Sequence, residues 1–145
     1  MTLYSTTALT DSVVTVTANG VSKEVKVSFT GIGVGEGTAL TVTAPAKVAA
    51  ASTFQVTAKL ADAYGNGVEA TAGRVKVTYT GAGIVFGTLP DKTDATGALS
   101  FSALLGAADK GLVTVKVQYD QNGDADFVDA KDLTVEKSIL VGVSA

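Results

Sequence analysis

The chain has 145 residues, 46% of them apolar, and a formal net charge of −3. This length is enough for one domain with a hydrophobic core, and the apolar fraction argues against intrinsic disorder. The absence of Cys and His excludes disulfides and metal sites of the zinc type, and no basic stripe is present that would bind nucleic acid. No apolar run approaches the length that spans a membrane.

The first predicted element is a β-hairpin over residues 12–30. Asn19-Gly20 is a strong hairpin-turn signal, and apolar residues alternate with polar ones on both sides of it. A lone two-stranded hairpin is only marginally stable in water. We therefore expect it to pair with the sheet edge of its own domain or with another copy of the chain. The alternating apolar residues are Val14, Val16, Ala18, Val25, Val27 and Phe29.

The remainder of the chain also predicts strands separated by glycine-rich turns. The Ala-rich run 46–51 predicts a loop or an edge strand. Near the C-terminus, every second residue from Leu133 to Val143 is apolar except Lys137, which predicts a bulge or strand break there. Roughly nine short strands with regular turns are typical of an antiparallel sandwich. The residues expected inside it are Phe54, Val56, Val75, Val77, Phe101, Val115 and Val117.

Two turn motifs lie among these strands. The first is D-x-x-G-N-x-V from Asp62 to Val68, and the second is T-D-x-x-G from Thr93 to Gly97. Asp62 and Asn66 are expected to hydrogen-bond the backbone in an Asx-type turn, and Asp94 and Gly97 to shape the entry to a hairpin. A role in ligand binding is the alternative.

The order of these motifs and strands, over about residues 38–141, resembles the bacterial Ig-like repeats of group 1, the invasin and intimin type. Gly67 stands where that family usually has Pro. The resemblance implies an all-β, antiparallel Ig-like β-sandwich, which we assign to residues 35–145, preceded by an N-terminal β-hairpin in residues 1–34. It also implies a module of the kind that is stacked in adhesins and other surface proteins.

Residues 12–30 are similar to the last strand pair of the chain. Both contain a Val-Thr-Val strand, a turn and a second strand that ends near Gly. The hairpin is therefore interpreted as the end of a preceding repeat, as in proteins built from tandem units. No signal peptide follows Met1, and we expect the sequence to be a segment of a longer chain.

The residue types give little support to catalysis. Without His there is no base for a nucleophilic triad, and the acids outside residues 120–136 are scattered over turns. Without Trp there is no indole platform for a sugar. We expect that the protein is not an enzyme.

One loop holds most of the negative charge. Residues 120–137 contain six acids and two bases, whereas the rest of the chain has a net charge of +1. Alternate residues of a curled loop can direct carboxylate and amide oxygens inward, and calcium takes six to eight such oxygen ligands. A solvated turn is the alternative. The segment resembles dockerin and other EF-hand-like loops, although strands flank it and it is one residue longer. By that resemblance the metal ligands are Asp120, Asn122, Asp124, Asp126, Asp129 and Asp132.

Two functions remain open from the sequence. The first is a structural or adhesive module of a bacterial cell-surface, S-layer-like or secreted protein, stabilised by Ca²⁺ and repeated or self-associating. Its partners would be neighbouring Ig-like modules or copies of itself. The alternative is a recognition module for a glycan or host protein, for which Tyr64 is the aromatic residue in an obvious loop. Neither reading involves nucleic acid or membrane insertion.

Overall fold

The computed structural model describes residues 9–29 and 37–142, and this part of the chain is built from strands alone. Thr30 and Val143, which the sequence placed in strands, lie outside these ranges. Among the described residues, no helix is long and apolar enough to cross a membrane. The strands are β1 (Leu9–Ala18), β2 (Val21–Phe29), β3 (Ala39–Thr43), β4 (Lys47–Val48), β5 (Thr53–Ala61), β6 (Val75–Thr80), β7 (Ile84–Val85), β8 (Ala98–Leu104), β9 (Gly111–Tyr119) and β10 (Leu133–Val141).

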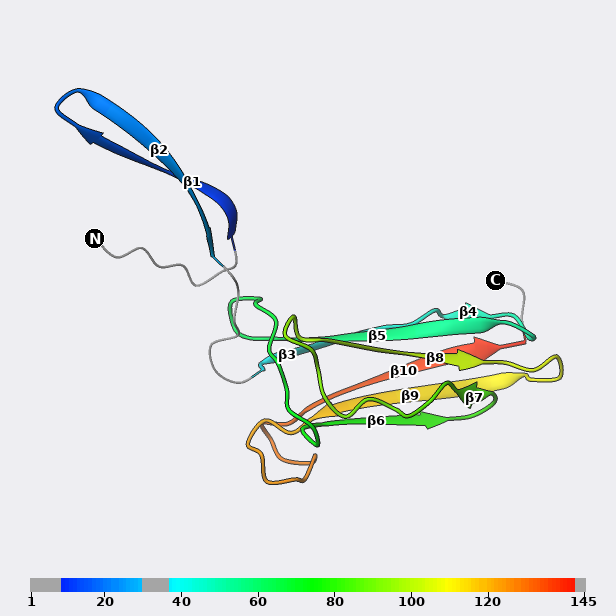
Figure 1. The fold of residues 1–145 in the computed structure, drawn as a ribbon. Helices are drawn as coiled ribbons and strands as arrows, with labels where there is room; N and C mark the ends of the chain where they lie inside the picture. Colours follow the sequence, from blue (N-terminus) through cyan, green and yellow to red (C-terminus); the bar gives the residue numbers. More distant parts are fainter. Residues whose placement is uncertain (1–8, 30–36, 143–145) are drawn as a thin grey trace.

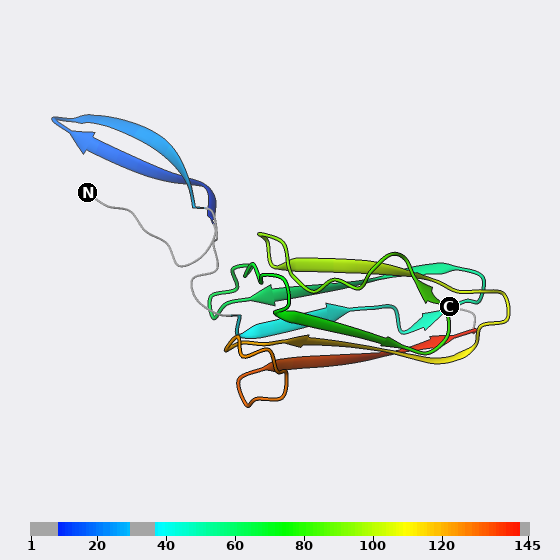
Figure 2. The ribbon, with the colours of Figure 1, turned by 60° about the horizontal axis from the view of Figure 1, so that its bottom comes forward.

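Two four-stranded sheets pack face to face (Figures 1 and 2). One has the order β3-β5-β8-β7 and the other β4-β10-β9-β6. This is the strand order of an immunoglobulin-like sandwich, in which strands A, B, E and D face strands C, F and G. Every pair is antiparallel except β4 with β10, which is parallel because the chain changes sheet between β3 and β4. The predicted Ig-like β-sandwich is thus confirmed.

The core forms where the alternating apolar faces of the two sheets meet. All seven residues that the sequence placed inside are buried, and Val56, Val115 and Val117 have no exposed surface. Each fully buried Val contributes about 1.5–3 kcal/mol of transfer free energy. The loops and the last strand add buried residues outside the predicted set, namely Val68, Ala70, Leu105, Ile139 and Val141.

The two turn motifs make the hydrogen bonds to the backbone that the sequence predicted. The Asp62 carboxylate accepts hydrogen bonds from the N–H groups of Tyr64 and Asn66, at 2.9 and 3.0 Å. The Asp94 carboxylate accepts bonds from the N–H groups of Thr96 and Ala98, at 2.8 and 3.0 Å. Both motifs therefore shape turns, as predicted.

The two motifs also lie directly against each other. A Cβ added to Gly67 would lie 1.9 Å from the carbonyl oxygen of Thr96. Leu60 N–H donates to the carbonyl of Gly97, and Val68 N–H donates to the carbonyl of Leu60, at 2.7 and 3.0 Å. Gly67 is thus needed for close backbone approach, and a residue with a Cβ, such as Pro, would not fit here.

The prediction of a bulge or break at Lys137 is wrong. β10 pairs with β9 in unbroken register from Leu133 to Val141, with Lys137 opposite Val115. Lys137 lies two residues before the buried Ile139, on the same face of β10, but is itself exposed. The reason is that β4 pairs only with Leu140 and Val141, so Lys137 lies on a sheet edge where its side chain reaches solvent. The Ala-rich run, in contrast, contains the edge strand β4 as predicted.

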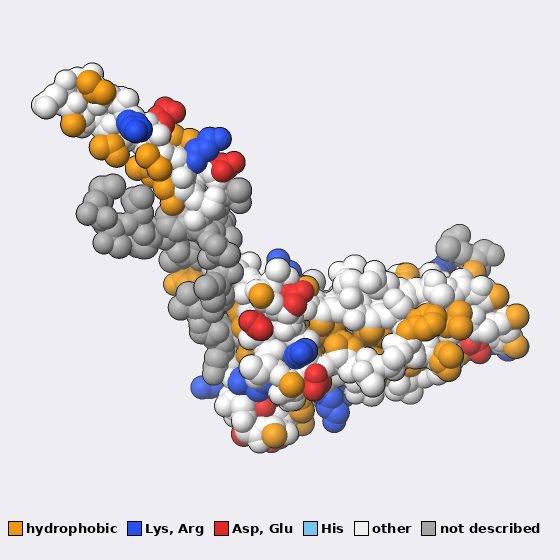
Figure 3. All heavy atoms as spheres, in the orientation of Figure 1, with side chains coloured by type: hydrophobic (Ala, Val, Ile, Leu, Met, Phe, Trp, Pro, Cys, Tyr) orange, Lys and Arg blue, Asp and Glu red, His pale blue; other side chains and the backbone are white. Residues whose placement is uncertain are grey.

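The predicted N-terminal hairpin is present. β1 and β2 pair antiparallel with each other and with no other described strand, and the turn residues Asn19 and Gly20 have φ values of 51° and 78°. The hairpin extends from the end of the sandwich at which β3 begins (Figure 1). Side chains of both strands are largely exposed, including several Val residues (Figure 3).

Candidate metal centre

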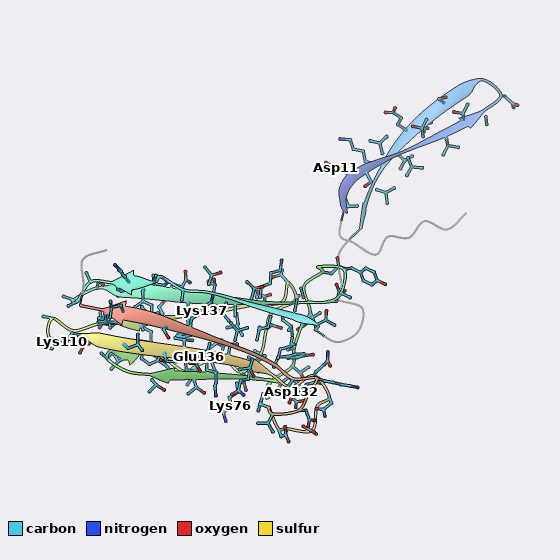
Figure 4. All side chains as sticks on the ribbon, turned by 180° about the vertical axis from the view of Figure 1, so that it is seen from behind. Asp11, Lys76, Lys110, Asp132, Glu136 and Lys137 are labelled. Atoms are coloured by element: carbon cyan, nitrogen blue, oxygen red, sulfur yellow. The ribbon has the colours of Figure 1, made fainter. Side chains whose placement is uncertain are left out.

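The acidic loop, residues 120–132, joins β9 to β10 at the end of the sandwich where the chain enters β3 (Figures 1 and 4). It is flanked by strands, as the sequence indicated. Gln121 Nε2 donates to the carbonyl of Gly37 at 2.9 Å, and Gly37 N–H donates to the Tyr119 hydroxyl at 3.4 Å. The base of the loop is therefore tied to the first described residue of the sandwich.

Two of the six predicted ligands hold the loop in shape. Asp120 is only 1% exposed, and its two carboxylate oxygens accept from Gly123 N–H at 2.6 Å and from Ala125 N–H at 3.0 Å. Asp132 accepts from the N–H groups of Gln121 and Asp129, at 3.0 and 2.9 Å. Both carboxylates therefore serve the loop backbone.

Three other predicted ligands form a surface cluster. Asp124, Asp126 and Asp129 are exposed, and each places a carboxylate oxygen within 4.8 Å of the other two. Asn122 lies beside them, and its Nδ2 donates to Asp124 at 2.9 Å and to Asp129 at 2.6 Å. The loop thus brings together Asn122 and three of the five predicted carboxylates.

The charges of the cluster act on one another. Hydrogen bonds from the Asp126 N–H and the Asn122 amide lower the pKa of Asp124. Asn122 also acts to lower the pKa of Asp129, but the negative charges of Asp124 and Asp126 outweigh it and the pKa is raised. The negative charge of the Asp129 carboxylate is therefore opposed by those of its acidic neighbours.

The donor set fits a hard cation. Asp124 and Asp126 each use Oδ1 to accept a backbone N–H, from Asp126 and Val128 respectively, at 3.0 Å in both cases. Oδ2 of Asp124 accepts from the Asn122 amide at 2.9 Å, so a metal would take the place of that amide nitrogen. Rotation of the Asn122 amide would present its oxygen in place of its nitrogen. Carboxylate and amide oxygens are the ligands that calcium takes, and backbone carbonyls or water complete its shell.

Arg74, immediately before β6, braces the loop, a role that no motif in the sequence indicates. Its Nε and Nη2 donate to the carbonyls of Asp120 and Gln121, each at 2.7 Å, and its guanidinium lies 5.6 Å from the centre of the Tyr119 ring. The only sequence signal for this role was the residue type, because Arg74 is the single Arg in a chain that otherwise uses Lys, of which it has ten. A planar fork of donors binds two adjacent carbonyls in a way that Lys does not.

A second contact fastens the outer part of the loop. Gln118 Nε2 donates to the carbonyl of Phe127 at 3.2 Å, and the Lys76 ammonium lies 5.8 Å from the centre of the Phe127 ring. Lys76 points from β6 towards this region in Figure 4. The loop is therefore attached to the sheet both at its base and near its middle.

Comparison of the chain with protein-family models, with curated proteins and with solved structures finds no match.

Proposed function

We propose that this chain is a structural module of a bacterial cell-surface or secreted protein, of the Ig-like invasin and intimin type, stabilised by Ca²⁺ in the β9–β10 loop. The observation that carries the proposal is the convergence of Asp124, Asp126 and Asp129 within 4.8 Å on a loop whose backbone is already fixed by other residues. The Ig-like strand order and the motif turns support the choice of module.

The loop backbone gives a second line of support. Ala125 has a φ of 70°, in the left-handed region that costs a non-glycine residue about 1–2 kcal/mol. It is the sixth residue counted from Asp120, and the EF-hand loop has its invariant Gly at position six, where the chain turns sharply. Strain of this kind persists where surrounding structure over-determines it, often at ligand clamps.

A bound calcium ion would supply positive charge to three carboxylates that otherwise repel one another. The carboxylates of Asp124, Asp126 and Asp129 would bind the ion, together with the amide oxygen of Asn122. Asp120 and Asp132 would keep the backbone curled, and Arg74 would keep the loop on the sheet. Because Gln121 and Tyr119 contact Gly37, a rigid loop would also fix the point at which the chain enters the sandwich.

Thermal unfolding in EDTA and in Ca²⁺ tests this function. A ligand that binds only the folded state stabilises it by about 2.7 kcal/mol at a hundredfold excess over Kd. The melting temperature should therefore rise with Ca²⁺, and much less with Mg²⁺, which prefers a smaller octahedral site. Asp129→Asn should remove most of the response. Asp91→Asn, the same change on an exposed acid between β7 and β8, should preserve it.

A melting temperature that is indifferent to Ca²⁺ and EDTA, together with no heat of calcium binding in calorimetry, would reject the metal site. The acids would then be a solvated turn. The module itself would still be tested by whether copies of the chain assemble.

One observation favours recognition as a second candidate function. Tyr64, at the tip of the Asp62 turn, is 56% exposed. Aromatic side chains on such loops can bind sugars or proteins through an apolar face and a polar hydroxyl. Glycan-array binding that Tyr64→Ala abolishes, while the melting temperature stays unchanged, would favour this function over a purely structural one.

A further inference from the structure

The β1–β2 hairpin is amphipathic. Because Val14 pairs with Val25 and Ser12 with Val27, one face of the ribbon is rich in Val and the other in polar groups. Val16, Val21 and Val25 on the Val face are at least half exposed, at 54, 71 and 50%. The Val-rich face contains Ser12, Val14, Val16, Ala18, Val21, Lys23, Val25 and Val27.

This hairpin lacks the support that such ribbons need. Two strands alone are marginal in water, and stability requires a third strand or packing of the apolar face. Among residues 9–29 and 37–142 neither is present, since β1 and β2 form a two-stranded sheet of their own. No described strand therefore pairs with the backbone edges of the hairpin or covers its apolar face.

The sandwich offers one long open edge. The edge strands of its two sheets are β4, β6, β3 and β7. β4 and β7 have two residues each, and β3 lies beside β10. β6, with six residues, has β9 as its only strand neighbour in the described part of the chain, and on its other side only Val75, at its start, is shown bonded, to Asp91. It is the edge best able to accept another strand.

The backbone of β6 points the necessary groups outward. Arg74 accepts from Asp120 N–H on the β9 side, whereas Val75 donates to the carbonyl of Asp91 on the opposite side, at 3.0 and 3.1 Å. Strand residues alternate, so the N–H and C=O groups of Val77 and Tyr79 also face away from β9. These groups form a template for strand addition.

Apolar side chains on β6 and in the segment that follows it are only partly covered. Tyr79 on β6, Ala82 in the following turn, Val85 on β7 and Leu89 beyond it are packed against the core but only partly buried. A strand added to β6 would lie over this half-covered row. The Val-rich face of a hairpin matches it chemically.

We propose that the β1–β2 hairpin of a second copy of the chain adds to the open edge of β6. Variable-type Ig domains carry a two-stranded C′–C″ extension at this edge of the sheet that holds strands C, F and G, and β6 is strand C here. Each copy offers both a hairpin and an edge, so reciprocal addition closes a twofold dimer. The inference deepens the proposed function by naming the partner of the module, and it does not depend on calcium.

The test combines sedimentation with hydrogen exchange on the full chain, from low to high micromolar concentration. The expected result is a dimer in which exchange of the Val77 and Tyr79 amides slows about tenfold or more as dimer forms, because new strand hydrogen bonds must open first. Val25→Asp, on the Val-rich face, should give a monomer with fast exchange at both amides. Val13→Asp is the matched control, because it makes the same change on the other face opposite Lys26, and it should still dimerise.

Three results would overturn the inference. One is a monomer at every concentration, including a monomer in which the two amides are protected by the hairpin of the same chain. Another is a dimer in which exchange at Val77 and Tyr79 is unchanged, as hairpin-to-hairpin pairing would give. The third is equal loss of dimer in Val25→Asp and Val13→Asp. A monomer whose melting temperature still rises with Ca²⁺ would leave the proposed function standing.

Discussion

Thr93 is the residue whose replacement tests the turn chemistry most sharply. Its side chain is 3% exposed, and its hydroxyl accepts from Ala70 N–H at 2.6 Å while donating to the carbonyl of Val68 at 2.8 Å. Thr93→Val keeps the shape of the side chain and removes both bonds. The change therefore isolates hydrogen bonding from packing.

The expected cost follows from what is left behind. Val68 and Ala70 are 5 and 4% exposed, so water cannot replace the lost partner at either backbone group. A buried donor or acceptor left unsatisfied costs about 1–3 kcal/mol, so the two groups left by Thr93→Val should destabilise the fold by roughly 2–6 kcal/mol. For a chain of this size that corresponds to a drop of roughly 6 to 24 °C in melting temperature.

Urea unfolding followed by circular dichroism measures this loss. The midpoint should fall while the slope m stays constant, because the same surface is exposed on unfolding. Thr93→Ser, which keeps the hydroxyl and loses a methyl group, should lose only about 1 kcal/mol. If Thr93→Val matched the wild type within about 0.5 kcal/mol, the size of an ordinary surface substitution, the hydroxyl would not be satisfying buried groups and the reasoning would fail.

Three further predictions follow from single positions. Hydrogen bonds, chiefly from the Thr96 hydroxyl and the Ala98 N–H, lower the pKa of Asp94 from 3.8. The ionised Asp94 carboxylate therefore stabilises the fold fully above pH 3.8, and this contribution is lost as pH falls through the lowered pKa. Asp94→Asn should flatten the curve of stability against pH between 3.8 and the lowered pKa. Ala125→Gly should stabilise the fold by about 1 kcal/mol in urea unfolding, because Gly tolerates positive φ, and a loss of stability would contradict this view of the loop. Arg74→Lys should weaken calcium binding in calorimetry although no ligand is changed, because Lys cannot bind two carbonyls as a fork, and an unchanged affinity would show that the brace is dispensable.

Local sequence signals predicted the features that depend on neighbouring residues. Alternation placed Val56 and Val115 in the core because each strand has one face towards the opposite sheet, and Asn19-Gly20 located the hairpin turn because few residues accept positive φ. The Asp62 turn was predictable for the same reason, since its bonds span only four residues.

Features that depend on the path of a long loop, or on distant parts of the chain, escaped prediction. Asp120 and Asp126 are the same residue type in one loop, but only Asp120 is buried with backbone N–H groups facing both oxygens, and that difference is decided by the path of the loop. Arg74 acts on carbonyls 46 and 47 residues away. The bulge predicted at Lys137 was wrong because the alternation of apolar residues does not reveal where the neighbouring strand β4 ends.

The change of sheet between β3 and β4 has a mechanical consequence. It places β4 parallel to β10, fastened by Leu140 N–H to the carbonyl of Ala46 and by Gly142 N–H to the carbonyl of Val48, each at 3.0 Å. The chain enters the sandwich at one end and leaves β10 at the other (Figure 2). Tension applied between these ends would pull β4 and β10 in opposite directions along their length. Hydrogen bonds that run across the strands would then bear the load together in shear, rather than opening one after another as in a zipper. Atomic-force stretching should accordingly show one abrupt rupture for the sandwich, at a force that falls when Leu140→Pro removes the first of these bonds.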